Sequence, residues 1–305
     1  MKNSTLNVVM AVKNDSKFLS QSIESILKQT YKDFKFLIVD DFGSKKVKKI
    51  LEHYRKKDQR IKIIKNKKNI GLTKSLIRAI NSSKSKFIAR IDSDDYSHKD
   101  RLQKQINWIN KSESRVLCGT NYYQIDKKNV FKKKKLPCNH KDIKKNIIYK
   151  NCFVHSSTLF RSKAYKQVGG YNKNIKYAQD YDLWSRLMHI GEVCNIRDKL
   201  TFIRINDNSI SSVFQKKQTL NSIIISCNNY HFLKKNYFFN INQDYKKNLH
   251  YFEKNSTISK FYYSIRFLNR KKLENKYYLG LFDLSFKSFK LCLKQPKMLI
   301  FSLLG

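Results

Sequence analysis

Short apolar runs alternate with helical patterns between residues 6 and 91. Four runs rich in β-branched residues have the length of buried strands, at 6–12, 34–39, 61–64 and 87–91. Apolar residues also recur at helical spacing, first at Phe18, Leu19, Ile23, Ile26 and Leu27, and later at Leu76 and Ile80. Alternating strands and helices predict an α/β fold with a mostly parallel sheet and helices on both faces.

Polar clusters follow three of these expected strands. They are Lys13-Asn-Asp15, Asp40-Asp41 and Asp92-Ser-Asp-Asp95. In an open α/β sheet the carboxyl ends of parallel strands form the edge at which ligands bind. Three polar clusters at that edge favour a nucleotide pocket over three unrelated turns.

The acidic cluster after the fourth strand narrows the chemistry further. A strand that delivers two or three carboxylates to its end can hold a hard divalent cation, which then takes phosphate oxygens as further ligands. An acidic turn is the alternative, because Asp is a favoured turn residue. The neighbouring clusters favour a site for Mn²⁺ or Mg²⁺.

The balance of charge is strongly basic. Among 305 residues, 64 are Lys or Arg and 23 are acidic, which gives a formal charge of +41. Such an excess suits nucleic acid, an anionic membrane surface or a phosphorylated substrate. The six cysteines are scattered without a Cys-Xaa-Xaa-Cys pair and indicate neither a zinc site nor a disulfide framework.

A change of composition after residue 214 suggests two domains. We expect an α/β domain at 1–214 and a basic, mainly helical region at 215–305. The apolar tail at 291–304 is too short to span a bilayer but could lie among lipid headgroups, or pack as an ordinary helix on the main domain. The apolar run at the N-terminus is too short for a signal peptide, and no later stretch is long enough to cross a bilayer. We therefore expect a cytoplasmic protein, peripheral at the inner face of the cell membrane.

Four segments carry a resemblance to a known family. They are Val8-Val-Met-Ala-Val-Lys-Asn14 with Ser25-Ile-Leu-Lys-Gln-Thr-Tyr31, then Leu37-Ile-Val-Asp-Asp41, then Asn69-Ile-Gly-Leu72 with Ile88-Ala-Arg-Ile-Asp-Ser-Asp-Asp95, and His155-Ser-Ser157 with Gly169-Gly-Tyr171 and Gln179-Asp-Tyr-Asp-Leu-Trp184. In order and spacing they resemble the inverting nucleotide-sugar glycosyltransferases of family 2, whose fold is called GT-A. The resemblance covers roughly residues 6–212.

The resemblance implies a position for the nucleoside of the donor. Ala11, Val12 and Asn14 would lie against it, and the carboxylate of Asp41 would contact base and ribose, with Asp40 as the alternative. Uridine is the usual base in this family.

The resemblance also implies roles for the acidic loop. Asp92 would lie near the ribose, and Arg90 would support the loop. Asp94, alone or with Asp95, would hold the metal that bridges the diphosphate.

A catalytic base is expected at the start of a later helix. Asp180 occupies the place of the family's Glu-Asp or Gln-Asp motif, and Asp182 is the competing carboxylate. Spacing alone would also allow Asp180 to be a helix N-cap. Further diphosphate or acceptor contacts are expected from His155, Gly169, Gly170, Asp182, Trp184, Arg204 and Asn206, although His155 could equally be a structural histidine.

Several positions depart from the family pattern. Asn206 replaces a histidine that often lies close to the metal, so water or His155 could supply that contact. Lys13 stands where an aromatic residue is common, and Phe42 interrupts the usual Asp-Asp-Gly-Ser turn. These changes leave the base specificity open.

The residues therefore predict a metal-dependent, inverting glycosyltransferase of hexosyltransferase type. It would move a sugar from a nucleotide donor, with UDP expected, to a saccharide or lipid-linked saccharide acceptor. The pathway expected is bacterial surface-polysaccharide synthesis, such as that of lipopolysaccharide or capsule. A nucleic-acid-binding protein is the first alternative, because 18 tyrosines and 20 phenylalanines accompany the charge. A catalytically degenerate scaffold is the second. No nucleic-acid motif is present, so no nucleic-acid partner is expected.

Overall fold

The computed structural model describes residues 4–13, 17–126, 131–147 and 150–205, with scattered positions between 214 and 229. The chain divides into two units, Met1–Gln215 and Lys216–Gly305, and the description below concerns the first. Asn14, Asn206 and the apolar tail, for which the sequence predicts ligand or membrane contacts, lie outside the described residues. The expected roles of the two domains stay predictions.

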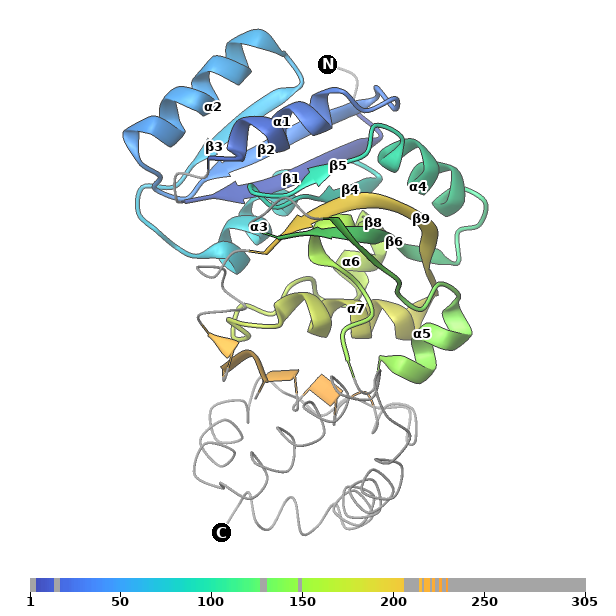
Figure 1. The fold of residues 1–305 in the computed structure, drawn as a ribbon. Helices are drawn as coiled ribbons and strands as arrows, with labels where there is room; N and C mark the ends of the chain where they lie inside the picture. The colour runs from blue at the N-terminus through green and yellow to red at the C-terminus, as the bar shows by residue number, and fades with distance from the viewer. Residues whose placement is uncertain are drawn as a thin grey trace, which may run out of the picture. The chain divides into compact units, whose positions relative to one another are not determined.

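In the described part of the chain, one sheet of nine strands forms the centre of the first unit (Figure 1). The strands are β1 (Leu6–Val12), β2 (Phe34–Asp40), β3 (Ile61–Lys65), β4 (Phe87–Arg90), β5 (Tyr96–Ser97), β6 (Arg115–Ile125), β7 (Phe131–Lys134), β8 (Leu159–Arg161) and β9 (Glu192–Arg204). Their order is β3-β2-β1-β4-β8-β6-β9-β5, and β7 pairs with β6.

The sheet is parallel in its first half and mixed in its second. β3, β2, β1 and β4 run parallel, as the alternating sequence pattern predicts. β8 then pairs antiparallel with both β4 and β6, whereas β6 and β9 are parallel. Every residue of β1 is buried, which explains why its apolar run is broken only at Asn7, because a parallel strand covered on both faces shows no alternation.

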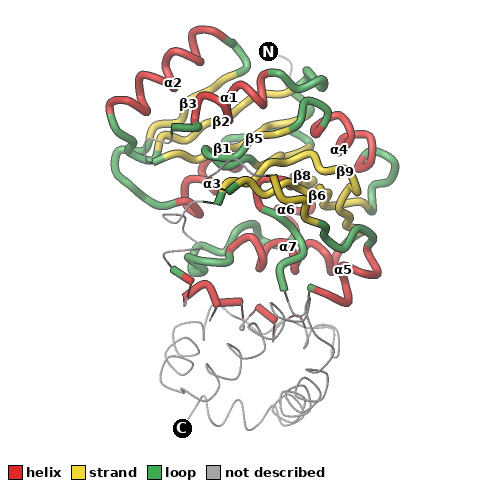
Figure 2. Tube along the Cα trace, viewed as in Figure 1, coloured by secondary structure: helices red, strands yellow, loops and turns green. Residues whose placement is uncertain are grey.

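Helices cover both faces of the sheet (Figure 2). They are α1 (Leu19–Leu27), α2 (Lys45–Lys57), α3 (Leu72–Asn81), α4 (Arg101–Ile109), α5 (His140–Asn146), α6 (Ser162–Gln167) and α7 (Gln179–Ile190), and a short 3₁₀ turn covers His155–Ser157. One core joins α1, α2 and α4 to alternate residues of β1, namely Leu6, Val8, Met10 and Val12. α3, α6 and α7 lie beyond the opposite face (Figure 1). The predicted α/β fold with helices on both faces is confirmed.

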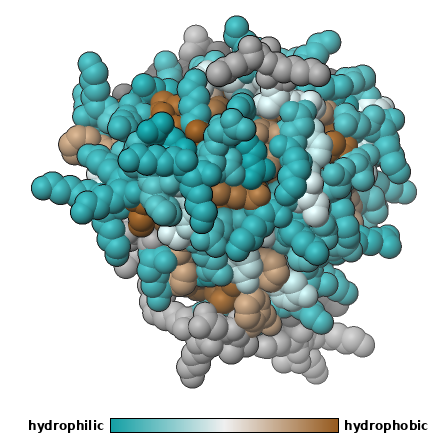
Figure 3. Space-filling view, turned by 90° about the horizontal axis from the view of Figure 1, so that it is seen from above, coloured by the Kyte–Doolittle hydropathy of each residue, from teal (hydrophilic) through white to brown (hydrophobic). Residues whose placement is uncertain are grey.

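One face of the described part of the chain is largely polar. Figure 3 shows mostly hydrophilic side chains on the face it presents, with apolar ones in small separate areas. Among the helices that the structure describes, none is both long and apolar enough to cross a membrane. The described cysteines Cys118, Cys138, Cys152 and Cys194 are all free.

Candidate active site

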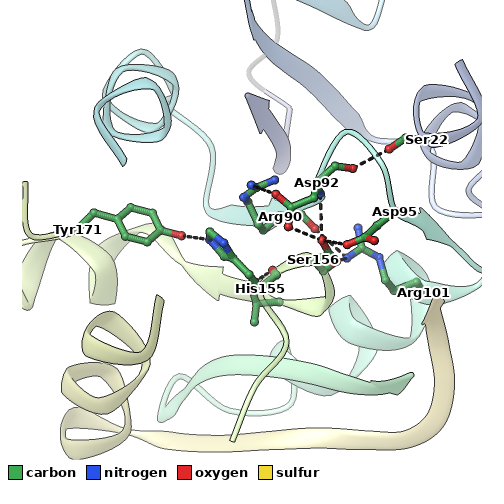
Figure 4. Close-up of polar contacts among 9 residues, drawn as sticks. Ser22, Arg90, Asp92, Asp95, Arg101, His155, Ser156 and Tyr171 are labelled. Atoms are coloured by element: carbon green, nitrogen blue, oxygen red, sulfur yellow. Dashed lines mark hydrogen bonds and ion pairs between the residues drawn. The ribbon is translucent and has the colours of Figure 1, made fainter. Parts of the chain in front are cut away.

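The acidic loop after β4 is held together by one serine (Figure 4). The hydroxyl of Ser156 lies 2.7 Å from Asp92 Oδ2 and 2.5 Å from Asp95 Oδ2, and it also accepts the backbone N–H of Asp92 at 3.0 Å. Ser22 donates to the Asp92 carbonyl at 2.8 Å and ties the loop to α1. The turn that contains Ser156 therefore fixes the direction of two carboxylates.

Two fully buried arginines support this loop from the protein interior. Arg90, the last residue of β4, forms an ion pair through Nη2 with Asp92 Oδ1. Arg101 donates through Nη1 to the carbonyls of Arg90, at 2.9 Å, and Ser156, at 2.6 Å. Burial lowers the pKa of Arg101 to about 9, so it stays charged at neutral pH. Arg90 thus contacts the loop, and its role in donor binding stays a prediction.

The three carboxylates of the loop differ in environment. Burial raises the pKa of Asp92, but the charge of Arg90, the neighbouring His155 and the hydrogen bonds from Ser156 and Arg90 together outweigh burial, and the pKa ends below its ordinary value. Burial and the charges of Asp92 and Asp94 hold the pKa of Asp95 well above its ordinary value. Burial and the charge of Asp92 also raise the pKa of Asp94. The loop concentrates negative charge that an external cation would stabilise.

Asp94 is the carboxylate of this loop that remains open to a metal. Both oxygens of Asp95 are engaged, Oδ1 by the Arg204 N–H at 3.0 Å and Oδ2 by Ser156. Within the described part of the chain, no other side chain donates a hydrogen bond to the Asp94 carboxylate. One open carboxylate fits Mg²⁺ or Mn²⁺, which takes few protein ligands when substrate phosphates supply the others. No group of three or more His, Cys, Asp or Glu suited to a metal occurs among the described residues.

Arg204 at the end of β9 faces the acidic loop. Its Nη1 donates to the Asp94 carbonyl at 2.8 Å, and its guanidinium lies 3.8 Å from the ring centroid of Phe18 and 5.1 Å from that of Tyr96. Its predicted contact with a diphosphate or acceptor stays a prediction. Arg204 closes the loop against the start of α1.

The two aspartates at the end of β2 point into the protein. Asp41 Oδ1 accepts from Asn66 Nδ2 and Ile70 N, each at 2.8 Å, and Oδ2 accepts from Asn69 Nδ2 at 2.6 Å and Gly71 N at 2.9 Å. Four internal donors satisfy this carboxylate, which fixes the loop before α3. The expected contact of Asp41 with a nucleoside would require some of these bonds to break.

Asp40 is equally internal. It is only 2% exposed, and its Oδ1 accepts the Gly43 N–H at 2.7 Å, which closes the turn after β2. Ala11 and Val12 at the end of neighbouring β1 are buried, so they can offer only backbone to a ligand. Among the described residues, the structure therefore brings Ala11, Val12, Asp40 and Asp41 to one edge, but it directs both carboxylates away from solvent.

Asp180 lies in the first turn of α7, beside the acidic loop. Burial raises its pKa to about 6, and the charge of Asp92 contributes to the same shift. Asn151 Nδ2 donates to Asp180 Oδ2 at 2.7 Å, while Asn151 Oδ1 accepts the Phe153 N–H at 3.1 Å. Asp180 is not the N-cap of α7, because that position is Ala178, whose φ is +64° and whose side chain makes no cap bond. A partly exposed carboxylate with a pKa near neutrality is suited to accept a proton.

The competing carboxylate, Asp182, belongs to the support of a neighbouring loop. It is 3% exposed and forms an ion pair with Arg186, which also donates to the Gly170 carbonyl at 2.8 Å. Gly169 and Gly170 have φ of +77° and +67°, a region that favours glycine. A Cβ on Gly170 would lie 2.6 Å from Tyr165 Cζ. Asp182 therefore holds the glycine turn in place through Arg186.

His155 and Trp184 belong to an aromatic cluster. His155 Nε2 and the Tyr171 hydroxyl are 2.8 Å apart, and burial lowers the pKa of His155 to about 3, so the imidazole is neutral. Trp184 is fully buried, with ring centroids 5.5 Å from Phe160 and 6.1 Å from His155. The geometry favours the structural interpretation of His155 and places Trp184 in the core.

The site thus combines residues that the sequence predicts with three that it does not. Ser156 lies in a motif that the resemblance includes, but its role in bridging two aspartates has no local signal. Asn151 and Arg101 are missed altogether, because a buried hydrogen-bond partner has no sequence pattern of its own. Only their position in the folded chain identifies them.

Comparison with known proteins identifies the family. A family model described as Glycosyl transferase family 2 matches residues 7–169, more than half of the chain. The chain belongs to this family. The match covers β1 to β8, including the acidic loop and the Ser156 turn, and ends at the glycine pair before α7.

Curated relatives of this family 2 glycosyltransferase extend the match. An uncharacterized glycosyltransferase, MJ1057, of Methanocaldococcus jannaschii is 35% identical over 229 residues, which are 73% of this chain and 78% of that protein. The O-antigen biosynthesis glycosyltransferase WbnJ of Escherichia coli is 36% identical over 204 residues, which are 66% of this chain and 78% of that protein.

Solved structures show the same fold at low identity. TarS 1-349 of S. aureus, in complex with UDP-GlcNAc, has a TM-score of 0.59 at 17% identity, covering 80% of this chain and 78% of that one. The mannosyltransferase PcManGT of Pyrobaculum calidifontis, in complex with GDP-Man and Mn²⁺, has a TM-score of 0.60 at 11% identity, covering 97% and 82%. The expected GT-A fold is confirmed.

Proposed function

We propose that this family 2 glycosyltransferase transfers a hexose, with inversion, from a nucleotide donor to a saccharide acceptor in surface-polysaccharide synthesis, in a metal-dependent reaction. The pairing of Asp180 with the acidic loop carries the proposal. The Asp180 carboxylate, with a pKa of about 6, lies close enough to Asp92 for the Asp92 charge to contribute to that pKa. In the acidic loop itself, the Asp94 carboxylate accepts no side-chain hydrogen bond within the described part of the chain. One group can thus accept a proton while the other faces the leaving diphosphate.

The reaction needs a base on the acceptor side. The acceptor hydroxyl oxygen attacks C1 of the donor sugar, the bond from C1 to the phosphate oxygen breaks, and the hydroxyl proton passes to the Asp180 carboxylate. Attack from the face opposite the leaving group inverts C1. A cation held by Asp94 would stabilise the negative charge that develops on the nucleoside diphosphate. Asn151 orients Asp180 for the transfer.

Two similarities support the donor and acceptor classes. TarS is crystallised with UDP-GlcNAc, which favours a UDP-sugar, while PcManGT with GDP-Man makes GDP the first competitor. WbnJ is an O-antigen biosynthesis enzyme, which favours an acceptor on the way to a surface glycan. A formal charge of +41 would attract the chain to an anionic membrane, where a lipid-linked acceptor resides.

Two variants separate the proposed roles. Asp94→Ala should abolish the metal-dependent binding of UDP or UDP-sugars, because it removes the open carboxylate of the loop. Asp180→Asn should bind the donor as the wild type does but transfer sugar about 10²- to 10⁴-fold more slowly, the usual effect of losing a general base. The matched control is Asp142→Asn, an exposed aspartate on α5.

Binding and turnover must be measured separately. Thermal shift with UDP, UDP-sugars, GDP and GDP-mannose, with and without Mn²⁺, reports binding, and release of nucleoside diphosphate reports turnover. Equal loss of donor affinity in Asp94→Ala and Asp180→Asn would contradict the division of roles. No stabilisation of the wild type by any nucleotide, with or without metal, would overturn the proposed function.

A further inference from the structure

The turn after β2 presents one large aromatic side chain to solvent. Phe42 is 57% exposed and is the most exposed of the large hydrophobic residues in the described part of the chain. It follows Asp41 directly, at the edge where the sequence predicts the nucleoside. Exposing an aromatic ring to water is unfavourable, so its position calls for a cause.

The backbone at Phe42 is also strained. Its φ is +63°, in the left-handed region that a phenylalanine rarely adopts. The turn imposes this conformation, because Asp40 Oδ1 accepts the Gly43 N–H at 2.7 Å. This bond joins the residue before Asp41 to the residue after Phe42 and so constrains the backbone between them. Strained residues of this kind cluster at ligand sites, where the surrounding structure imposes them.

The two acidic residues before Phe42 point inward, whereas Phe42 points to solvent. Asp40 and Asp41 are 2% and 3% exposed, and their carboxylates are used inside the protein. A Cβ on Gly43 would lie 3.1 Å from the Lys13 carbonyl, so the turn packs directly against the end of β1. Phe42 therefore stands over the joined ends of β1 and β2, where ligands of such sheets bind.

One face of the ring has a cationic neighbour. Lys48 Nζ, from the first turns of α2, lies 5.4 Å from the ring centroid. An aromatic ring with a cation over one face can stack a planar group on its other face. Every nucleobase is planar and can stack in this way.

We propose that Phe42 is the nucleobase-stacking residue of the donor site. This inference rests on the proposed function, since it assigns the base of the nucleotide donor to a particular side chain. It also replaces the expected carboxylate contact at Asp41 with an aromatic one. Stacking is tolerant of base identity, so the residue would contribute affinity more than selectivity between UDP and GDP.

The first test measures nucleotide affinity by titration calorimetry in the presence of Mn²⁺. Phe42→Ala should weaken the affinity for the nucleotide that the wild type binds, UDP or GDP, by roughly 5- to 150-fold, the range that base stacking on aromatic side chains gives. Phe42→Tyr should stay within about twofold of the wild type, because it keeps the ring. Phe131→Ala is the matched control, since Phe131 is similarly exposed, at 50%, and lies on β7 instead of in the turn after β2.

A second test separates binding from packing. Asn tolerates a positive φ better than Phe, so Phe42→Asn should keep or raise the melting temperature while it loses nucleotide affinity. In Phe42→Trp, nucleotide should quench the new indole fluorescence, whereas Phe131→Trp should not respond.

The outcomes distinguish the two proposals. A wild type that binds neither UDP nor GDP would overturn the proposed function and with it the assignment of Phe42. A wild type that binds, together with unchanged affinity in Phe42→Ala, would overturn the assignment alone. A clear fall in melting temperature in Phe42→Asn would identify Phe42 as a packing residue and would also overturn it.

Discussion

Asn151 donates a hydrogen bond of 2.7 Å from Nδ2 to Oδ2 of Asp180. The donor is itself oriented, because its Oδ1 accepts the Phe153 N–H at 3.1 Å. The bond stabilises the ionised form of a carboxylate whose pKa burial raises to about 6. Asn151 therefore orients the carboxylate of Asp180, the proposed base, and helps to keep it largely deprotonated at neutral pH.

Replacing Asn151 should shift the pH dependence of transfer upward. In Asn151→Asp the donor becomes a like charge, so the pKa of Asp180 should rise by about one unit or more. The deficit in kcat/KM should then be larger at pH 6.5 than at pH 8.5. Rate profiles between pH 5 and 9 measure this. Asn107→Asp, at an exposed position on α4, should leave the profile unchanged; a uniform loss at every pH would show that Asn151 only supports the fold.

Asp180→Asn should make the protein more stable above pH 6. The folded pKa of about 6 exceeds the ordinary value of 3.8, so between these values the folded state binds more protons than the unfolded state. The carboxylate therefore lowers stability as pH rises through 6, and Asn removes that cost. Allowing for partial exposure, we expect a gain on the order of 1 kcal/mol at pH 8 and almost none at pH 4. Urea unfolding at both pH values measures it, and an equal gain at both would contradict the linkage.

Asp182→Asn should affect stability rather than chemistry. Removing one partner leaves Arg186 unpaired in a largely buried position, which costs about 3 kcal/mol. The pH profile of transfer should keep its midpoint, because Asp180 is unchanged. Urea unfolding measures the stability of this variant and of Asp180→Asn, and the pH dependence of the transfer rate is measured for both. An upward shift or complete loss of transfer in a folded Asp182→Asn would make Asp182 the base instead.

The sequence predicts the first half of the fold well because its signals are local. The apolar run at 6–12 matches β1 at both ends, and the helical pattern after it matches α1. Parallel strands buried on both faces, such as β1, give continuous apolar runs that stand out from their surroundings. The predicted family is confirmed for the same reason, since its motifs lie at the ends of these strands.

The second half depends on contacts between distant residues. β6 pairs with β9, and the paired residues Arg115 and Glu192 are 77 positions apart in the sequence. No local pattern specifies such a pair. Ser156 reaches Asp92 and Asp95 only because β8 pairs antiparallel with β4. Likewise, a turn rich in aspartate does not reveal which side chains face inward. That is why sequence reasoning expects a ligand at Asp41, while the structure gives Asp41 four internal donors.

The glycine pair before α7 offers a test of how the acceptor side is held. Both residues have a positive φ, so alanine at either costs about 1–2 kcal/mol in backbone strain. Space differs between them: a Cβ on Gly169 would meet nothing within 4 Å, whereas one on Gly170 would lie 2.6 Å from Tyr165 Cζ. Gly170→Ala should therefore destabilise the protein by about 1–3 kcal/mol more than Gly169→Ala.

A double-mutant cycle with Tyr165→Ala isolates that difference. Removing the ring should recover part of the loss in Gly170→Ala, giving a coupling energy of about 1 kcal/mol or more, and should combine additively with Gly169→Ala. Urea unfolding of the six proteins supplies every term. Because the Gly170 carbonyl accepts from Arg186, a shifted turn should also slow transfer in Gly170→Ala more than in Gly169→Ala. Equal destabilisation by the two alanines, without coupling to Tyr165, would show that the turn relaxes freely and does not fix the position of the residues before Asp180.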